Sequence, residues 1–165
     1  MQQLYLQIFS YICTMAAIEE EIKQNKKFES EYIKAFVNIQ FTSSWLYNIN
    51  AARMKKYGIT PEQFNVLRIL RGSHPKPLML GSVTCRMVDK ASNATRLVEK
   101  LRQKGYVERE LCETNRRQVD IMITNKGLAL LSKIDNESEE WNDTLKGITK
   151  AEAQELNRIL DKLRD

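Results

Sequence analysis

The chain has 165 residues, of which 42% are hydrophobic and 28% are charged. This length fits one domain, or one domain with an appended helical segment, and it excludes two large catalytic domains. The composition supplies enough apolar residues for a core and enough charge for solubility. It therefore excludes both a disordered tail and a membrane bundle.

The net charge of +5 is concentrated in the middle of the chain. Between Gly72 and Gly127 there are eleven basic and six acidic residues, so the whole positive excess lies in this central third. A charged surface taken alone is usually only solvated. The meaning of the excess therefore depends on the elements that carry it.

The first 27 residues are predicted to form a loosely held or disordered leader. Residues 1–14 are fairly apolar, but no Lys or Arg precedes Lys23. A secretory signal needs a cationic start, and the apolar run is too short to span a bilayer. The segment before Met15 is either part of the native protein or an over-extended gene start, and both readings stay open.

The cysteines and the single histidine argue against several kinds of site. Cys13, Cys85 and Cys112 are an odd number without close pairing, which disfavours a disulfide framework and a zinc ribbon. A reducing compartment, the cytoplasm, is therefore expected. His74 has no cysteine partners, so neither a metal site nor a cofactor is predicted. With no Gly-x-Ser-x-Gly elbow, no phosphate-binding glycine loop and no second histidine, the chain is not expected to be an enzyme.

Residues 28–58 are predicted to form one long helix. No Pro or Gly interrupts the stretch from Phe28 to Tyr57, apolar residues recur at spacings of three and four, and Gly58 provides a stop. Thirty residues at about 1.5 Å each make a rod of roughly 45 Å. So small a domain cannot cover this rod, so we expect a second copy of the chain against it, with a monomer as the alternative.

Residues 59–127 are predicted to form one domain, and its first part is predicted to be helical. Thr60 to Gln63 has the hydroxyl, proline and glutamine of a capped helix start, and Gly72 ends that helix. A short helix is expected from Leu78 to Met87. After a break at residues 88–90, a longer helix is expected from Ala91 to Lys104, with Asp89 as its N-cap and Gly105 as its stop.

After Gly105 the hydrophobic pattern changes to that of a β-hairpin. Tyr106 to Cys112 is β-prone, Glu113 to Arg117 is polar and turn-like, and Gln118 to Thr124 alternates apolar with polar residues. Thr124 can cap a following helix. Residues 128–165 are then predicted to form C-terminal helices, the first running through Trp141 and the last opened by a capping box at Thr149 to Glu152.

A short helix, a break, a longer helix and a basic hairpin form the plan of a winged helix-turn-helix. The predicted fold is thus mainly α with a small β-hairpin wing (α+β), flanked by N- and C-terminal dimerisation helices. A major groove of roughly 12 Å admits one helix. The helix from Ala91 turns its apolar side inward and leaves a polar set outward, which we predict to contact DNA: Ser92, Asn93, Thr95, Arg96 and Lys100.

The residue types in this set suit base reading. Asn and Arg offer two-pronged hydrogen bonds that match adenine and guanine edges, and hydroxyls suit phosphates or either base. At the hairpin tip, Arg116 and Arg117 are predicted to enter a minor groove or to bind phosphates. Double-stranded DNA is therefore the expected partner, and no membrane is expected.

Three stretches of this region resemble a known family. Residues 92–101 (SNATRLVEKL), 104–109 (KGYVER) and 124–127 (TNKG) are similar to the recognition helix, the helix stop with the first wing strand, and the entry to the following helix of MarR-family bacterial regulators. The order of elements extends the resemblance from Phe28 to Leu163. It implies an obligate homodimer built by the first and last helices, and a pseudo-palindromic operator. It further implies a regulator, most simply a repressor, that a small aromatic or phenolic ligand releases.

The wing departs from the family pattern at one position. The family usually has Asp-x-Arg there, whereas Asn115 stands where the acid is expected before Arg117. An asparagine accepts a hydrogen bond but gives no charge pairing. Arg117 is therefore expected to be less rigidly oriented than its family equivalent.

The ligand pocket implied by the resemblance is expected where the dimer helices meet the winged domain. Four aromatic residues are candidates for its lining: Phe36, Trp45, Tyr47 and Phe64. Aromatic residues at helical spacing more often belong to a plain core. These four aromatic residues alone therefore do not decide whether a ligand pocket exists, and the pocket is a hypothesis.

Two other functions stay open at this point. A winged helix can instead bind another protein, but such a surface exposes apolar anchors, whereas this one is predicted to expose Asn93, Arg96 and Lys100. A redox-responsive regulator is the other alternative. No cysteine lies in the first long helix, and Cys85 and Cys112 are expected to be packing residues.

Overall fold

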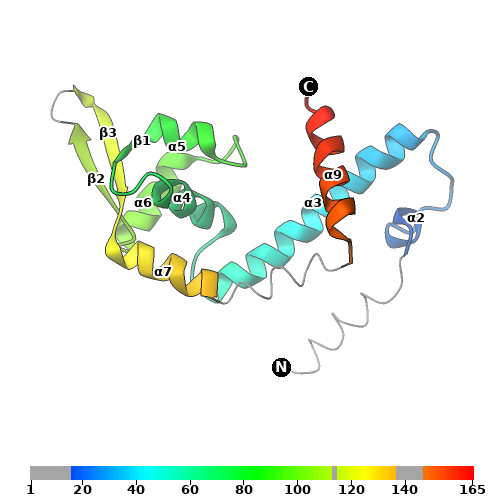
Figure 1. Cartoon of the computed structure of the whole chain (residues 1–165), viewed down its shortest axis with the longest axis horizontal. Coiled ribbons are helices and arrows are strands. Elements are labelled where there is room, and N and C mark those ends of the chain that lie inside the picture. Colours follow the sequence, from blue (N-terminus) through cyan, green and yellow to red (C-terminus); the bar gives the residue numbers. More distant parts are fainter. Residues whose placement is uncertain (1–15, 113–114, 137–146) are drawn as a thin grey trace. The chain divides into compact units, whose positions relative to one another are not determined.

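The computed structural model describes residues 16–112, 115–136 and 147–165, with the backbone alone described at residues 110–112 and 115–118. The chain divides into two compact units, Met1–Arg53 and Met54–Asp165. Figure 1 shows the elements in chain order. None of the described helices is long and apolar enough to cross a membrane.

The first unit contains α2 (Ile18–Glu21) and nearly all of α3 (Glu31–Lys55). The sequence pattern did not predict α2, because its acidic residues are typical of a solvated segment. In the structure Ile18 is buried, and Glu19 forms an ion pair with Lys34 of α3 at 2.8 Å. Residues 1–15 of the predicted leader lie outside the described residues.

The end of α3 agrees with the predicted stop. Gly58 has a φ of 68°, in the left-handed region that glycine adopts without steric cost. The amide of Ile59 then donates to the carbonyl of Met54 at 3.3 Å, which closes the turn. The next helix, α4 (Pro61–Arg71), begins with the predicted capping box: the amide of Gln63 donates to Thr60 Oγ1 at 3.3 Å, and the amide of Thr60 donates to Gln63 Oε1 at 3.2 Å.

Three strands form one antiparallel sheet in the order β1-β3-β2. They are β1 (Leu78–Met79), β2 (Val107–Cys112) and β3 (Asn115–Ile123). The predicted helix from Leu78 was wrong at its start, because Leu78 and Met79 pair with Ile121 and Asp120 of β3. The hairpin of β2 and β3 lies at the edge of the second unit (Figure 1).

The remaining helices are α5 (Leu80–Arg86), α6 (Ala94–Gln103), α7 (Asn125–Asn136) and α9 (Lys150–Lys162). Thr124 caps α7 as predicted, because its Oγ1 accepts from the amide of Gly127 at 3.1 Å. The predicted capping box from Thr149 to Glu152 also forms and begins α9. Trp141, which was predicted to lie on the preceding helix, falls outside the described residues.

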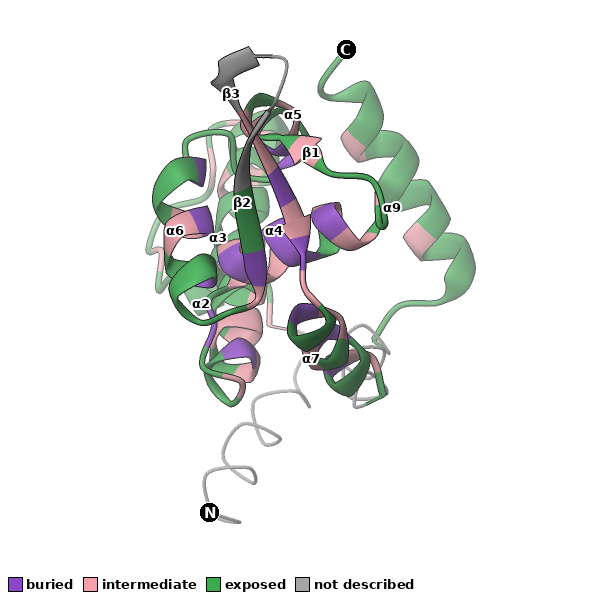
Figure 2. Ribbon diagram, turned by 90° about the vertical axis from the view of Figure 1, so that its left-hand side faces the viewer, coloured by how far each residue is buried: buried purple, intermediate pink, exposed green. Residues whose placement is uncertain are grey.

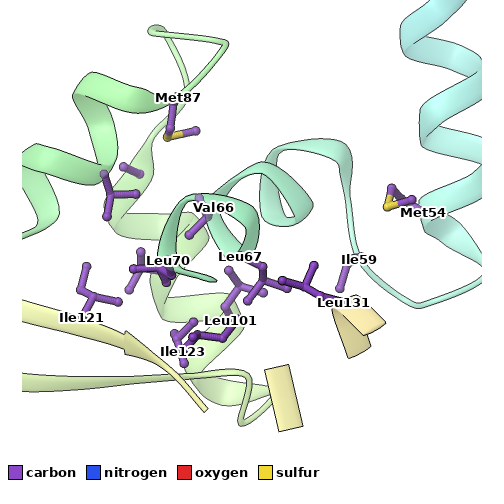
Figure 3. Packing of buried hydrophobic residues seen from close by; sticks show 14 of the residues in the cluster. Met54, Ile59, Val66, Leu67, Leu70, Met87, Leu101, Ile121, Ile123 and Leu131 are labelled. Atoms are coloured by element: carbon purple, nitrogen blue, oxygen red, sulfur yellow. The ribbon is translucent and has the colours of Figure 1, made fainter. Parts of the chain in front are cut away.

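One hydrophobic core holds the second unit together, and it draws on α4, α5, α6, α7 and the sheet (Figure 2). Figure 3 shows Leu70 of α4, Leu101 of α6 and Ile123 of β3 gathered within it. Met54, in the last turn of α3, is also fully buried in this cluster. The arrangement confirms a mainly helical fold with a small β wing. The buried face of α6 packs against α4.

Candidate nucleic-acid interface

The two faces of α6 have opposite character. Ala94, Val98 and Leu101 are buried, while Thr95, Arg96 and Lys100 are exposed. Since side chains three and four residues apart share one face of a helix, this division is the one that the sequence spacing predicts. The core therefore anchors one side of α6 and leaves a basic side in solvent.

The start of α6 differs from the prediction. The helix begins at Ala94 rather than Ala91, and Asn93 rather than Asp89 is its N-cap: Asn93 Oδ1 accepts from the amide of Arg96 at 3.0 Å. Both Asn93 and Ser92 therefore precede the helix. The cap occupies one of the two acceptor positions of Asn93 Oδ1, and the DNA contacts of Asn93 and Ser92 stay predictions.

Asp89 organises the turn that leads into α6. Its carboxylate accepts from the amide of Ala91 at 2.9 Å and from the Ser92 hydroxyl at 2.6 Å. These two hydrogen bonds, the one from Ser92 first, hold the pKa of Asp89 below its ordinary value. The amide of Val88 donates to Asn65 Oδ1 of α4 at 3.0 Å, so the turn is tied to the helix behind it.

The basic residues of α6 differ in their partners. Arg102 binds Glu99 through two hydrogen bonds of 2.8 and 3.0 Å, and this pair lowers the pKa of Glu99 and raises that of Arg102. Arg96 and Lys100 form no ion pair with any residue whose side chain the structure describes. Their charges are therefore available to an external anion, whereas the charge of Arg102 is already paired.

The tip of the wing differs from the prediction in where its second strand begins. Arg116 and Arg117 lie on β3, which begins at Asn115, and not in a turn as the sequence pattern indicated. The strand extends this far because Cys112 of β2 pairs with Asn115 across the hairpin. The side chains of Arg116 and Arg117 lie outside the described part, so their DNA contacts stay a prediction.

The four aromatic candidates for a ligand pocket are divided between the two units. Phe36, Trp45 and Tyr47 are exposed on α3 in the first unit. Phe64 is half-buried on α4 in the second unit, where the guanidinium of Arg68 lies 5.7 Å from its ring centroid. The shared pocket stays a prediction.

Cys85 corrects another expectation. It was predicted to be a packing residue, but its side chain is exposed on α5. Val83 is the buried position of this short helix, and a residue two positions later points about 200° away around the helix axis. Cys85 therefore lies in an open groove with Met79, Leu80 and Val119.

Comparison with known proteins finds a family match over part of the chain. Residues 59–119, which include α4, α5, α6 and β2, match the model of the MarR family. MgrA of Staphylococcus aureus is 28% identical over 109 residues, which are 66% of this chain and 72% of that protein. Over residues 59–119 the chain therefore has the sequence pattern of a MarR-family domain.

Two solved structures of other proteins show the same fold. A mutant MarR of E. coli in complex with operator DNA has a TM-score of 0.72 at 22% identity, over 84% of this chain and 99% of that one. BpsR of Bordetella bronchiseptica, whose DNA binding is regulated by 6-hydroxynicotinic acid, has a TM-score of 0.62 at 22% identity, over 78% and 99% of the two chains. Together with the family match, these structures support a MarR-family winged-helix transcriptional regulator, and the role of α6 as its recognition helix stays a prediction.

Proposed function

We propose that this regulator binds a pseudo-palindromic DNA operator as a homodimer and represses transcription by occupying it. The observation that carries the proposal is α6, whose apolar face is buried and whose opposite face presents Arg96 and Lys100, neither of them ion-paired with a side chain that the structure describes. A helix of this kind fits a major groove, where arginine reads guanine and lysine binds phosphate or guanine. The operator complex of E. coli MarR supports the same use of the fold.

Exposed apolar surface supports the homodimer. Leu156 and Ile159 of α9 and its C-cap residue Leu163 recur at helical spacing and are 48%, 49% and 67% exposed. Tyr32, Phe36 and Ile39 recur at helical spacing on α3 and are exposed as well. Stripes of this size are usually covered by a partner. A second copy of the chain would give the two-fold symmetry that places two recognition helices roughly 34 Å apart, one turn of DNA.

Selection of bound fragments from random duplexes tests the proposal. We expect the recovered sequences to share an inverted repeat, which would report specificity and symmetry together. Affinity for a recovered duplex should fall steeply with salt, by about 0.9 in the slope of log affinity against log salt for each phosphate neutralised. Recovery of no shared motif, with weak binding that salt does not affect, would instead indicate a winged helix that binds another protein.

The dimer makes a separate prediction on α9. Changing Leu156 to Glu places a carboxylate in the proposed apolar interface, and burying it without a partner costs several kcal/mol. We expect the dimer dissociation constant in sedimentation equilibrium to rise by about a hundredfold, which corresponds to about 2.7 kcal/mol. Gln154→Glu adds the same charge to the opposite, exposed face of α9 and should leave the dimer intact. Equal behaviour of the two variants would contradict the interface.

Release by a small aromatic acid is the last part of the proposal. It is supported by the behaviour of BpsR and by the exposed aromatic side chains Phe36, Trp45 and Tyr47. A ligand lowers operator affinity only by its differential binding to the competent and incompetent states. We expect at least one member of a panel of phenolic acids, at millimolar concentration, to release the recovered duplex. No release by any member would rule out this mode of regulation.

A further inference from the structure

The C-terminal end of the recognition helix is held by a side chain that the predicted DNA-binding set does not include. Lys104 is the C-cap of α6, and its Nζ donates to the carbonyl of Gly58 at 2.5 Å. Gly58 belongs to the turn that follows α3. A single ammonium group thus joins the end of α6 to the turn that follows α3.

The same ammonium group reaches a second oxygen. Lys104 Nζ lies 3.4 Å from Gln63 Oε1, which also accepts from the amide of Thr60 in the cap of α4. Gln63 is only 2% exposed and is the buried polar residue of the described core. A charged donor to a buried, already oriented oxygen makes a stronger hydrogen bond than a neutral one. Lys104 is therefore fixed in direction, although much of it is exposed.

The backbone carbonyl of Lys104 is bound by a side chain of α7. Its carbonyl accepts from Lys126 Nζ of α7 at 2.8 Å, and the next carbonyl, of Gly105, accepts from the Thr124 hydroxyl at 2.8 Å. Carbonyls at a helix end have no partner within the helix, so these donors satisfy them. The end of α6 is thus attached both to the turn after α3 and to the start of α7.

From this junction we infer that Lys104 is a positioning residue, which sets the spacing between the two recognition helices of the dimer. The inference rests on the proposed function, since α3 carries an apolar stripe of the proposed dimer contact. Met54, in the last turn of α3, is buried in the core that holds α6, and Lys104 attaches four residues beyond it, at Gly58. Lys104 lies eight residues after Arg96, about 12 Å along the helix, so it acts on the helix orientation and not on a base.

Parallel selections from random duplexes test this role, with the wild type, Lys104→Met and Lys104→Arg. The wild type is expected to recover half-sites at one fixed spacing. Lys104→Met keeps the aliphatic stem but loses the donor, so it should recover the same half-site at several spacings. Its affinity for a duplex with the wild-type spacing should fall about tenfold, or about 1.4 kcal/mol. Lys104→Arg should keep the fixed spacing because the guanidinium can still donate to Gly58.

Controls separate positioning from other roles. Lys162→Met removes an equal charge from an exposed site on α9 and should recover the wild-type spacing. If Lys104→Met does not fold, Lys104→Gln, whose amide is too short to reach Gly58, is expected to show the same spread of spacings. A fixed spacing in the Lys104 variants, even with lower thermal stability, would mean a merely structural role and would overturn the inference.

Two further outcomes also count against it. A salt slope reduced by about 0.9 in Lys104→Met would make Lys104 a phosphate contact. If the wild type itself recovers no motif, the proposed function fails and the inference fails with it. A fixed wild-type spacing that Lys104→Met shares overturns only the inference.

Discussion

Replacing Arg96 by alanine is expected to weaken binding to the recovered operator by about 1 to 3 kcal/mol and to relax the base preference at one position of each half-site. The guanidinium of Arg96 is exposed and forms no ion pair with any described side chain, so its two-pronged donors are available to a guanine edge. The backbone amide of Arg96 still donates to Asn93 in the variant, so the helix cap is retained. Competition against duplexes substituted at each position measures the effect.

Arg102→Ala is the matched control for this prediction. It removes the same charge from the same helix, but its guanidinium is already paired with Glu99. Both partners are substantially exposed, and such pairs contribute little. We expect the base preference of this variant to equal that of the wild type. A loss of affinity in Arg96→Ala that is equal for all sequences would show that Arg96 contacts phosphate and does not read a base.

The basic face of α6 could be predicted because it depends on local spacing alone. The apolar residues that the core buries recur every three or four positions, and this pattern survives in any tertiary context. The start of the helix could not be predicted as well. Asp89, Ser92 and Asn93 are all competent N-caps, and the hydrogen bond between Asn65 and Val88 helps to place the turn. That bond joins residues 23 positions apart, which no local pattern reveals.

The elements that the sequence pattern missed depend on distant partners. The two-residue strand β1 has no periodicity of its own and exists because β3 lies beside it. In α2, Ile18 is buried and Glu19 is paired with Lys34, fifteen positions later in the chain. Both features are decided by packing, which overrides local propensity.

The role of Lys104 was also out of reach of the sequence. A lysine at a helix end is common, since it interacts favourably with the last carbonyls of its own helix. Here the side chain instead binds the carbonyl of Gly58, 46 positions earlier. Only the packing of α6 against α4 and the position of the turn after α3 reveal that contact. The positive charge of the central third therefore comprises residues that face solvent, such as Arg96, and residues that hold the fold, such as Lys104.

Changing Gly127 to alanine is expected to lower the free energy of unfolding by about 3 kcal/mol, and the melting temperature by roughly 6 to 12 °C. A Cβ built at Gly127 would lie 2.4 Å from the carbonyl oxygen of Tyr106 and 2.7 Å from Cγ1 of Ile123. The carbonyl of Tyr106 is backbone and also accepts from the amide of Thr124 at 3.0 Å. It cannot move aside without disturbing the start of α7, so strain is unavoidable.

Gly81→Ala is the matched control, since Gly81 lies in α5 and a Cβ there meets no atom within 4 Å. Alanine has the higher helix propensity, so this variant should gain about 0.5 to 1 kcal/mol. Thermal unfolding followed by circular dichroism compares the two variants. If Gly127→Ala melted with the wild type, the close approach of α7 to Tyr106 would be absent in solution. Thr124 and Lys126 donate hydrogen bonds to the carbonyls of Gly105 and Lys104 at the end of α6, and these bonds depend on that close approach. Without them, the proposed orientation of the recognition helix would rest on the contact of Lys104 with Gly58 alone.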